Sequence, residues 1–301
     1  MSKVLVLLKR TPYTEYVLAE HDSHVMKLLA QHDPSVARWR KSHDDHESTV
    51  NELRAALTRL GETAVFSDAP TTRIDETFDL VVTVGGDGTL LAASHQLGSD
   101  ARLLGINSAP QHSVGFFCGG HKGNVYGTLK KALANRLPCT TLSRMQVALN
   151  GKVLHARVLN EALFCHASPA ATSKYILSVR TKRSHAREEE QKSSGLWIGP
   201  AAGSTAAQRS AGGKVLPLTS TQIQYVVREP YTPLGKRLRL IQGLVSEGGE
   251  IQLRNKMRAA RLYLDGHKTE FKLALGDVLV MSRSPQPLCV VGLIGRRKTT
   301  R

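Results

Sequence analysis

The sequence predicts an α/β protein in which an N-terminal open parallel-sheet (Rossmann-like) domain is followed by a β-rich C-terminal domain. Short apolar segments alternate with helical patterns from residue 4 to about residue 134, as in a sheet with helices on both faces. After Pro138 the pattern changes to β-branched segments that are separated by glycines. We therefore predict two domains, residues 1–141 and residues 142–301.

The elements of the first domain follow from local patterns. Residues 4–8 form a continuous apolar run, which is expected for a strand buried on both faces. Residues 12–60 are polar with a helical pattern that ends at Gly61, and residues 80–84 are a β-branched strand that ends at Gly85. The other predicted elements are strands at 63–66 and 103–106 and helices at 89–97 and 125–134.

The second domain consists mainly of predicted strands between glycine-containing turns. Its best helical pattern covers residues 204–210. The predicted strands are residues 144–149, 152–159, 175–181, 195–199, 223–227, 250–253, 259–264 and 277–281.

Charge indicates an anionic partner. The net charge is +16, and residues 151–301 hold 25 Lys and Arg against 10 Asp and Glu. Nucleotides, polyphosphate, nucleic acid and acidic lipid all fit such a surface, as does a role in solubility with a disordered basic tail at residues 295–301. Aromatic residues make up only 5%, and no nucleic-acid-binding signature occurs, so we predict no nucleic-acid partner. No apolar run approaches the roughly 20 residues of a membrane span.

The four cysteines are scattered singly and form no C-x-x-C pair, so we expect reduced thiols and neither a zinc site nor a disulfide framework. The N-terminus lacks a secretory signal. The expected location is the cytoplasm, with the mitochondrial matrix as the alternative if a targeting peptide has been removed.

The strongest motif is the segment Gly85-Gly86-Asp87-Gly88-Thr89, in which a buried strand turns into a helix. Glycines let the backbone approach a phosphate closely, and the N–H groups of the helix start face the anion. A carboxylate beside phosphates is useful if it accepts a proton from a sugar hydroxyl or coordinates a metal-bound phosphate. The alternative is a plain strand-to-helix turn with Asp87 as its cap.

The motif resembles the GGDGT loop of NAD kinases, which diacylglycerol kinases, sphingosine kinases and phosphofructokinases share in similar form. Three later segments resemble NAD kinases in the same order: Leu104–Asn107 followed by Gly115-Phe116, Asn160-Glu161, and Gly203–Ala206 running on to Gly213. Weaker similarity extends to Tyr263–Gly266. Residues 107–115 and 192–196 look like the mitochondrial NAD kinase type of animals, whereas the absent targeting peptide favours a bacterial relative.

The resemblance implies an enzyme that transfers a phosphoryl group from ATP or polyphosphate to the 2′-hydroxyl of the adenosine ribose of NAD, giving NADP. Asp87 would be the general base. Mg²⁺ or Mn²⁺ would arrive with ATP rather than occupy a protein metal site, and the protein would be a homodimer or larger oligomer with its sites near the subunit interface. The residues implied to bind the dinucleotide or its phosphates are Gly85, Gly86, Gly88, Thr89, Phe116, Asn160, Glu161, Ser194, Thr205, Ala206, Ala207 and Ser210.

Two positions differ from the NAD kinase pattern. Most NAD kinases carry Asp where this chain has Ser194, and that Asp contacts the nicotinamide end of NAD, often across a subunit interface. Most also carry Tyr where this chain has Ala207. Both differences bear on how the nicotinamide half is held and on the preference between NAD and NADH.

Two charged segments have alternative interpretations. His43-Asp44-Asp45-His46 fits a metal site or, better, a solvated helix start whose carboxylates face the positive end of the helix dipole. Lys9-Arg10 follows the first strand, where the carboxyl ends of parallel strands meet a ligand, so the pair fits either donor phosphates or a solvated surface.

Two other functions compete with NAD kinase activity. A lipid kinase shares the GGDGT loop, but Asn160-Glu161 and the Gly203–Ala206 segment argue against it, and no amphipathic membrane-binding stretch is evident. A non-catalytic nucleotide-binding protein fits the basic second half, but the presence of Asp87 favours catalysis.

Overall fold

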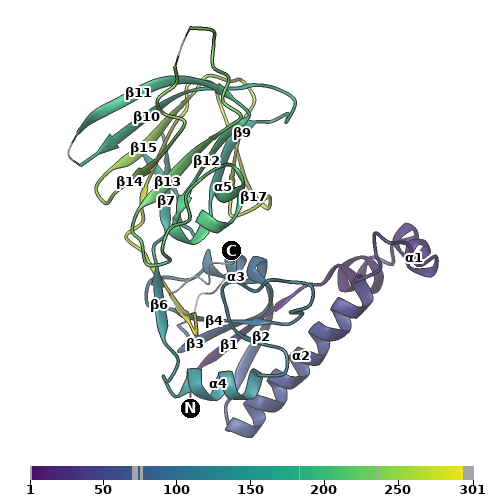
Figure 1. Ribbon diagram of the computed structural model, residues 1–301. Coiled ribbons are helices and arrows are strands. Elements are labelled where there is room, and N and C mark those ends of the chain that lie inside the picture. The colour runs from purple at the N-terminus through teal and green to yellow at the C-terminus, as the bar shows by residue number, and fades with distance from the viewer. Residues whose placement is uncertain (1, 70–73, 75–76, 183, 236, 294–301) are drawn as a thin grey trace. The chain divides into compact units, whose positions relative to one another are not determined.

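The computed structural model describes residues 2–69, 74, 77–182, 184–235 and 237–293, and the predicted basic tail lies outside them (Figure 1). The chain forms two compact units. The first contains Met1–Thr140 together with Leu288–Ile294, and the second contains Thr141–Pro287. Among the described residues, no helix is long and apolar enough to cross a membrane.

The first unit is built on a seven-stranded sheet with the order β2-β1-β3-β4-β19-β6, and β5 pairs with β4. The pairs that β1 makes with β2 and β3 are parallel, as are those that β4 makes with β3, β5 and β19. Its strands are β1 (Val4–Lys9), β2 (Ala64–Ala69), β3 (Leu80–Gly85), β4 (Arg102–Asn107), β5 (Cys118–His121), β6 (Cys139–Leu142) and β19 (Leu288–Val291).

Helices cover both faces of this sheet (Figure 1). Residues of α2 and α4 pack on the face that carries Val4, Val82 and Ile106. Leu90 of α3 lies against Gly105 on the opposite face, since successive strand residues alternate. The helices are η1 (Tyr13–Ala19, a π-helix), α1 (Ser23–Ala30), α2 (Trp39–Leu60), α3 (Asp87–Ser94) and α4 (Val125–Leu133).

The second unit consists of two antiparallel six-stranded sheets. The first has the order β11-β10-β15-β18-β7-β8 and the second the order β14-β13-β12-β9-β16-β17. Their strands are β7 (Met145–Leu149), β8 (Lys152–Val158), β9 (Ala162–His166), β10 (Ser173–Thr181), β11 (Ser184–Ser193), β12 (Gly195–Pro200), β13 (Ile223–Arg228), β14 (Gln242–Val245), β15 (Glu250–Asn255), β16 (Ala260–Leu264), β17 (Thr269–Leu273) and β18 (Val278–Arg283).

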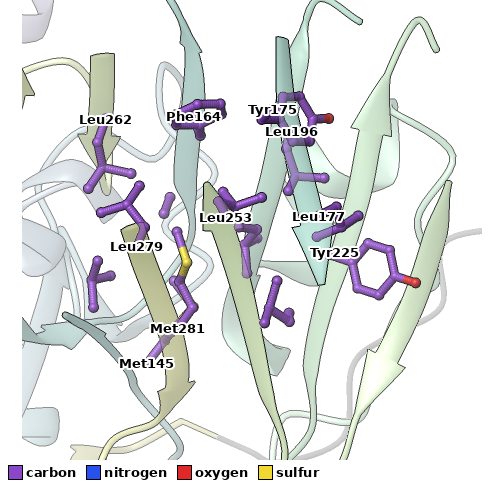
Figure 2. Packing of buried hydrophobic residues seen from close by; sticks show 14 of the residues in the cluster. Met145, Phe164, Tyr175, Leu177, Leu196, Tyr225, Leu253, Leu262, Leu279 and Met281 are labelled. Carbon is purple, nitrogen blue, oxygen red and sulfur yellow. The ribbon is translucent and has the colours of Figure 1, made fainter. Parts of the chain in front are cut away.

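The core of the second unit is formed by buried side chains of both sheets (Figure 2). Leu177, Leu253 and Leu279 come from one sheet, and Phe164 and Leu196 come from the other. Phe164 also packs edge-to-face on Tyr175, with ring centroids 5.3 Å apart. Strands such as β10 and β15 contribute alternate residues to this core, which is the pattern of a β-sandwich.

These elements confirm the predicted fold class, an N-terminal parallel-sheet domain with helices followed by a β-rich domain. The eight strands predicted for the second domain are present, and the predicted helix at 204–210 is a 3-10 turn, η2 (Ala201–Thr205), followed by the short helix α5 (Ala207–Ser210). The strands β5, β6, β9, β11, β14, β17 and β19 were not predicted.

The expectation of four reduced thiols is wrong in one respect. Cys139 on β6 and Cys289 on β19 form a disulfide, with their Cα atoms 5.6 Å apart. The two residues are separated by 150 positions in sequence and meet because β19 lies beside β6 in the sheet. Cys118 and Cys165 are free.

Candidate active site

The glycine-rich turn joins the buried strand β3 to helix α3. Gly85 ends the strand, and Asp87 is the first residue of the helix. A Cβ atom on Gly85 would lie 2.2 Å from Thr89 Oγ1, and one on Gly86 would lie 2.5 Å from Ser113 Oγ, so larger residues collide at both positions. No atom lies within 4 Å of the corresponding point on the exposed Gly88, so a ligand can approach the backbone there.

Asp87 is held by the loop that follows β4. Its carboxylate accepts hydrogen bonds from the backbone N–H groups of Phe116 and Phe117, both at 2.8 Å. That loop is itself shaped by Asn107, whose side-chain amide donates to the carbonyl oxygen of Ser113 at 2.9 Å. A carboxylate has about four acceptor positions, so two bonds fix its direction and leave capacity for a substrate hydroxyl.

Cys118 lies near this carboxylate, and its surroundings disfavour the thiolate form. Burial, with the charge of Asp87 adding to it, raises the pKa of its thiol to about 12. The protonated thiol therefore predominates at neutral pH.

In the second unit, Asn160 and Glu161 lie in a turn between β8 and β9. This turn is also held by a carboxylate that accepts hydrogen bonds from backbone N–H groups. The carboxylate of Asp265 accepts hydrogen bonds from the backbone N–H groups of Leu159, Asn160 and Glu161, at 2.8, 2.7 and 3.0 Å. The backbone N–H of Asp265 donates in return to the carbonyl oxygen of Glu161 at 2.9 Å. These hydrogen bonds hold the turn in place from the end of β16, which is the strand that pairs with β9.

Asn160 and Glu161 each present a buried oxygen that needs a partner. Asn160 Oδ1 and Glu161 Oε2 accept no hydrogen bond from the residues that the structure describes. Burial, followed by the charge of Asp265, raises the pKa of Glu161 to about 7. Leaving a buried acceptor unpaired costs about 1–3 kcal/mol, which a ligand with hydroxyl or amine groups can recover.

The Gly203–Ala206 segment packs directly on this turn. A Cβ atom on Gly203 would lie 1.8 Å from the carbonyl oxygen of Asn160, and one on Gly199 would lie 2.2 Å from the same atom. Only glycine permits this approach. Thr205, Ala206 and Ala207 are half-buried just beyond it, and Ser210 is exposed at the end of α5.

Ser194 lies elsewhere on the second unit. It is half-buried between β11 and β12, and its backbone N–H donates to the carbonyl oxygen of Arg228 at 3.0 Å. Gly199, which contacts Asn160, is at the other end of β12. At a rise of roughly 3.3 Å per residue, Ser194 lies about 16 Å from Gly199, so this chain does not bring Ser194 next to Asn160 and Glu161.

Comparison with known proteins identifies the family. A sequence model described as the ATP-NAD kinase N-terminal domain matches residues 2–136. A protein of Oryza sativa subsp. japonica named probable NADH kinase is 35% identical over 267 residues, which cover 82% of this chain and 81% of the rice protein. This chain belongs to the NAD kinase family.

Two further relatives support this assignment. An NAD kinase of Methanospirillum hungatei JF-1 is 30% identical over 69% of this chain and 72% of its own length. The crystal structure of an NAD kinase from Archaeoglobus fulgidus in complex with ATP shares the fold, with a TM-score of 0.68 at 19% identity over 98% of this chain and 94% of that chain. The chain is therefore a phosphotransferase of the NAD kinase type, and neither a lipid kinase nor a non-catalytic nucleotide-binding protein is favoured.

The structure groups the predicted site residues of this NAD kinase within each unit. In the first unit, Gly85, Gly86, Gly88, Thr89 and Phe116 surround Asp87. In the second, Asn160 and Glu161 lie beside the turn that carries Thr205, Ala206 and Ala207, with Ser210 farther along and Ser194 apart. The ligand contacts assigned to these residues remain predictions.

Sequence reasoning missed the role of Asp265. The Tyr263–Gly266 segment shows only weak similarity to the family, although an Asp before a Gly in a strand-ending turn is a position where a carboxylate often binds backbone N–H groups. Its partners are more than 100 positions away, with sequence separations of 104 to 106.

The interpretation of His43–His46 as a solvated helix start is wrong. Helix α2 begins at Trp39, so this segment lies within the helix. His46 is buried and its Nδ1 lies 3.0 Å from Ser108 Oγ, while Asp45 forms an ion pair with Lys122 at 2.5 Å. Among the described residues, no three His, Cys, Asp or Glu side chains are grouped as a metal site.

Proposed function

We propose that this NAD kinase transfers the terminal phosphoryl group of a polyphosphate donor to the 2′-hydroxyl of the adenosine ribose of NAD or NADH. The observation that carries the proposal is the oriented carboxylate of Asp87 at a glycine turn that opens a helix. Such a turn presents backbone N–H groups to phosphate, and the carboxylate is the one base built into it.

The reaction is an in-line displacement. Asp87 accepts the proton of the 2′-hydroxyl as that oxygen forms a bond to the terminal phosphorus. The bond between this phosphorus and the bridging oxygen breaks, and the shortened donor leaves with the bridging oxygen's electron pair. With ATP as the donor, the products are ADP and NADP or NADPH.

Asn160 and Glu161 recognise the acceptor in this proposal. An amide offers both a donor and an acceptor, which suits an adenine edge, and a carboxylate accepts hydrogen bonds from paired ribose hydroxyls. Their unpartnered buried oxygens support this role. Relatives named for NADH and for NAD both occur, so the proposal includes both acceptors.

ATP is the donor that we propose first, because the Archaeoglobus fulgidus relative of the same fold was solved in complex with ATP. Polyphosphate is the alternative. We propose that Mg²⁺ or Mn²⁺ enters bound to the donor phosphates, whose negative charge it offsets. We also propose, from the family resemblance alone, a homo-oligomer located in the cytoplasm or the mitochondrial matrix.

The test is NADP or NADPH formation by the purified protein, with each acceptor and each donor, in the presence of Mg²⁺. Turnover that stops on addition of EDTA and returns with Mg²⁺ is expected. A folded protein that forms neither product with any donor, but phosphorylates diacylglycerol or sphingosine, would contradict the proposal.

The substitution Asp87→Asn tests whether Asp87 is the general base. General-base catalysis contributes typically 10²–10⁴-fold, so kcat should fall by about that factor while the protein stays folded. Asp79→Asn is the control, because Asp79 is an exposed carboxylate that also accepts a backbone N–H, from Lys3 at 2.7 Å. Equal activity of the two variants would remove Asp87 from the mechanism.

A further inference from the structure

Lys9 stands at the topological switch point of the first unit. Strand β1 lies between β2 and β3, so the chain leaves β1 toward one neighbour and later returns to the other. In open α/β sheets ligands bind outside the carboxyl ends of the strands at such a point. Those ends carry Lys9 on β1 and Gly85 on β3, and a Cβ atom on Gly85 would lie only 3.0 Å from Lys9 Cβ.

Lys9 is half-buried, and within the part of the chain that the structure describes its ammonium has no anionic partner. No carboxylate among the described residues forms an ion pair with it, whereas Lys122, on the same side of the unit, pairs with Asp45. Burial lowers the pKa of Lys9, which reflects the cost of holding this charge out of water. A partly desolvated cation beside a phosphate-binding turn, without an ion-pair partner among the described residues, is a position for an anion.

His46, whose pKa is affected by the charge of Lys9, adds no positive charge at this edge. Burial, followed by the charges of Lys9 and His43, lowers the pKa of His46 to about 4, so its ring is neutral at pH 7. His46 contacts Ser108 at the end of β4. Arg10, the next residue along the chain, is exposed.

We propose that Lys9 binds the phosphate groups of the phosphoryl donor. The inference rests on the proposed kinase function and adds to it the residue that pairs with the donor's charge. It resolves the two interpretations of Lys9-Arg10, with Lys9 as the ligand contact and Arg10 as the solvated member of the pair.

The test compares Lys9→Met, Lys9→Arg and Arg10→Ala in the full chain. Methionine matches the length of the lysine stem and its packing on Gly85 but removes the charge. Lys9→Met should raise the KM for ATP by about tenfold or more, which corresponds to roughly 1.4 kcal/mol, and leave the KM for NAD unchanged. Lys9→Arg should retain most of the donor affinity, and Arg10→Ala should behave as the wild type.

A binding measurement separates this inference from the proposed function. A fluorescent ATP analogue is bound to each variant and displaced with ATP or with inorganic tripolyphosphate, in the absence of NAD. Weaker displacement by both competitors in Lys9→Met alone supports the inference, even if the wild type forms no NADP or NADPH. Unchanged displacement in Lys9→Met, equal losses in Lys9→Met and Lys9→Arg, or a shift confined to the KM for NAD overturns it.

Discussion

Two aspartates illustrate how single residues hold the chemistry of this protein. Asp87 and Asp265 both accept hydrogen bonds from consecutive backbone N–H groups, and each thereby fixes a loop that is distant in sequence. In one case the carboxylate is itself the proposed base. The carboxylate of Asp265 instead orients the turn that carries Asn160 and Glu161, and it adds negative charge beside Glu161.

The raised pKa of Glu161 predicts a pH-dependent affinity for the acceptor. With a pKa of about 7 in the free protein, Glu161 is mostly protonated at pH 6 and mostly ionised at pH 8. Ribose hydroxyls donate to the ionised form, so binding of NAD lowers this pKa and releases protons at pH 6. The affinity for NAD should therefore weaken as the pH falls from 8 to 6.

Titration calorimetry at pH 6 and pH 8, in two buffers of different ionisation enthalpy, measures this proton release. Glu161→Gln should bind NAD with no such pH dependence. The same shift affects stability, since the unfolded carboxyl ionises near 4.5 and the folded one near 7. Glu161 therefore lowers the free energy of unfolding increasingly between those pH values, and the substitution should remove that decline. An affinity that is flat from pH 6 to pH 8 in the wild type would contradict the assignment.

Ser194 predicts a weak preference between the oxidised and reduced acceptors. If the position meets the nicotinamide ring, as the family resemblance implies, a carboxylate there would attract the positive ring of NAD⁺ by about 1 kcal/mol at 4 Å in water. Ser194→Asp should raise the NAD⁺ over NADH ratio of kcat/KM several-fold.

Arg228 bears on how that experiment is designed. Its Nη1 lies 3.5 Å from the carbonyl oxygen of Ser194, so a new carboxylate at 194 would be partly neutralised by its guanidinium. Ser194→Asp combined with Arg228→Gln should therefore show the larger change, with Arg228→Gln alone as the control. An unchanged ratio in both Ser194→Asp proteins, with stability intact, would mean that Ser194 only begins strand β12.

At the scale of elements, a helix or strand could be predicted from the sequence where residues within the segment determine it, and not where contacts with distant segments do. Strands such as β3 are β-branched and apolar along their whole length, and the glycine turn after it is a local motif. Strand β11 (Ser184–Ser193) contains three consecutive glutamates and reads as polar loop, but antiparallel pairing with β10 holds it in the sheet. Helix α2 begins at Trp39, and Arg38 before it makes no side-chain capping bond, so no local cap in the sequence indicates its start.

The residues of the candidate site also divide into those that a local motif identifies and those whose roles depend on distant contacts. Asp87 and Asn160-Glu161 could be found from short motifs, because the turn and its chemistry lie within a few residues. The contacts from Asp265 to the Asn160-Glu161 turn and from Lys9 to Gly85 depend on strand pairing between distant segments. No local pattern specifies that pairing, so the sequence alone assigns no role to Asp265 and leaves two alternatives for Lys9.

The contact between the η2 turn and the Asn160-Glu161 turn predicts a sharp requirement for glycine. Gly203→Ala places a methyl group 1.8 Å from the carbonyl oxygen of Asn160, so one of the two backbones must move. Affinity for NAD should fall at least tenfold, while displacement of the fluorescent ATP analogue stays unchanged. Gly98→Ala is the control, because no atom lies within 4 Å of its new methyl group. Normal NAD binding by a folded Gly203→Ala protein would show that the two turns are not coupled.

At the scale of the whole molecule, the first unit is completed by the end of the chain. Strand β19 lies between β4 and β6 in the sheet, and Leu288, Val290 and Val291 are fully buried there. Gly292 also donates its backbone N–H to the carbonyl oxygen of Pro138 at 2.8 Å. The first unit therefore cannot form its complete sheet until the second unit has been synthesised.

A pair of truncations tests this dependence. Full burial contributes roughly 1.5–3 kcal/mol for each such side chain, so loss of the three removes about 5–9 kcal/mol, close to the roughly 5–15 kcal/mol that stabilises a typical domain. A chain ending at Pro287 should lose the amide-exchange protection of β1, β3 and β4, while the second unit keeps its protection because its core contains no residue of β19. A chain ending at Leu293 keeps the whole strand and should match the full-length protein. Equal protection of β3 and β4 in the two truncated proteins would show that the first unit is stable without its last strand.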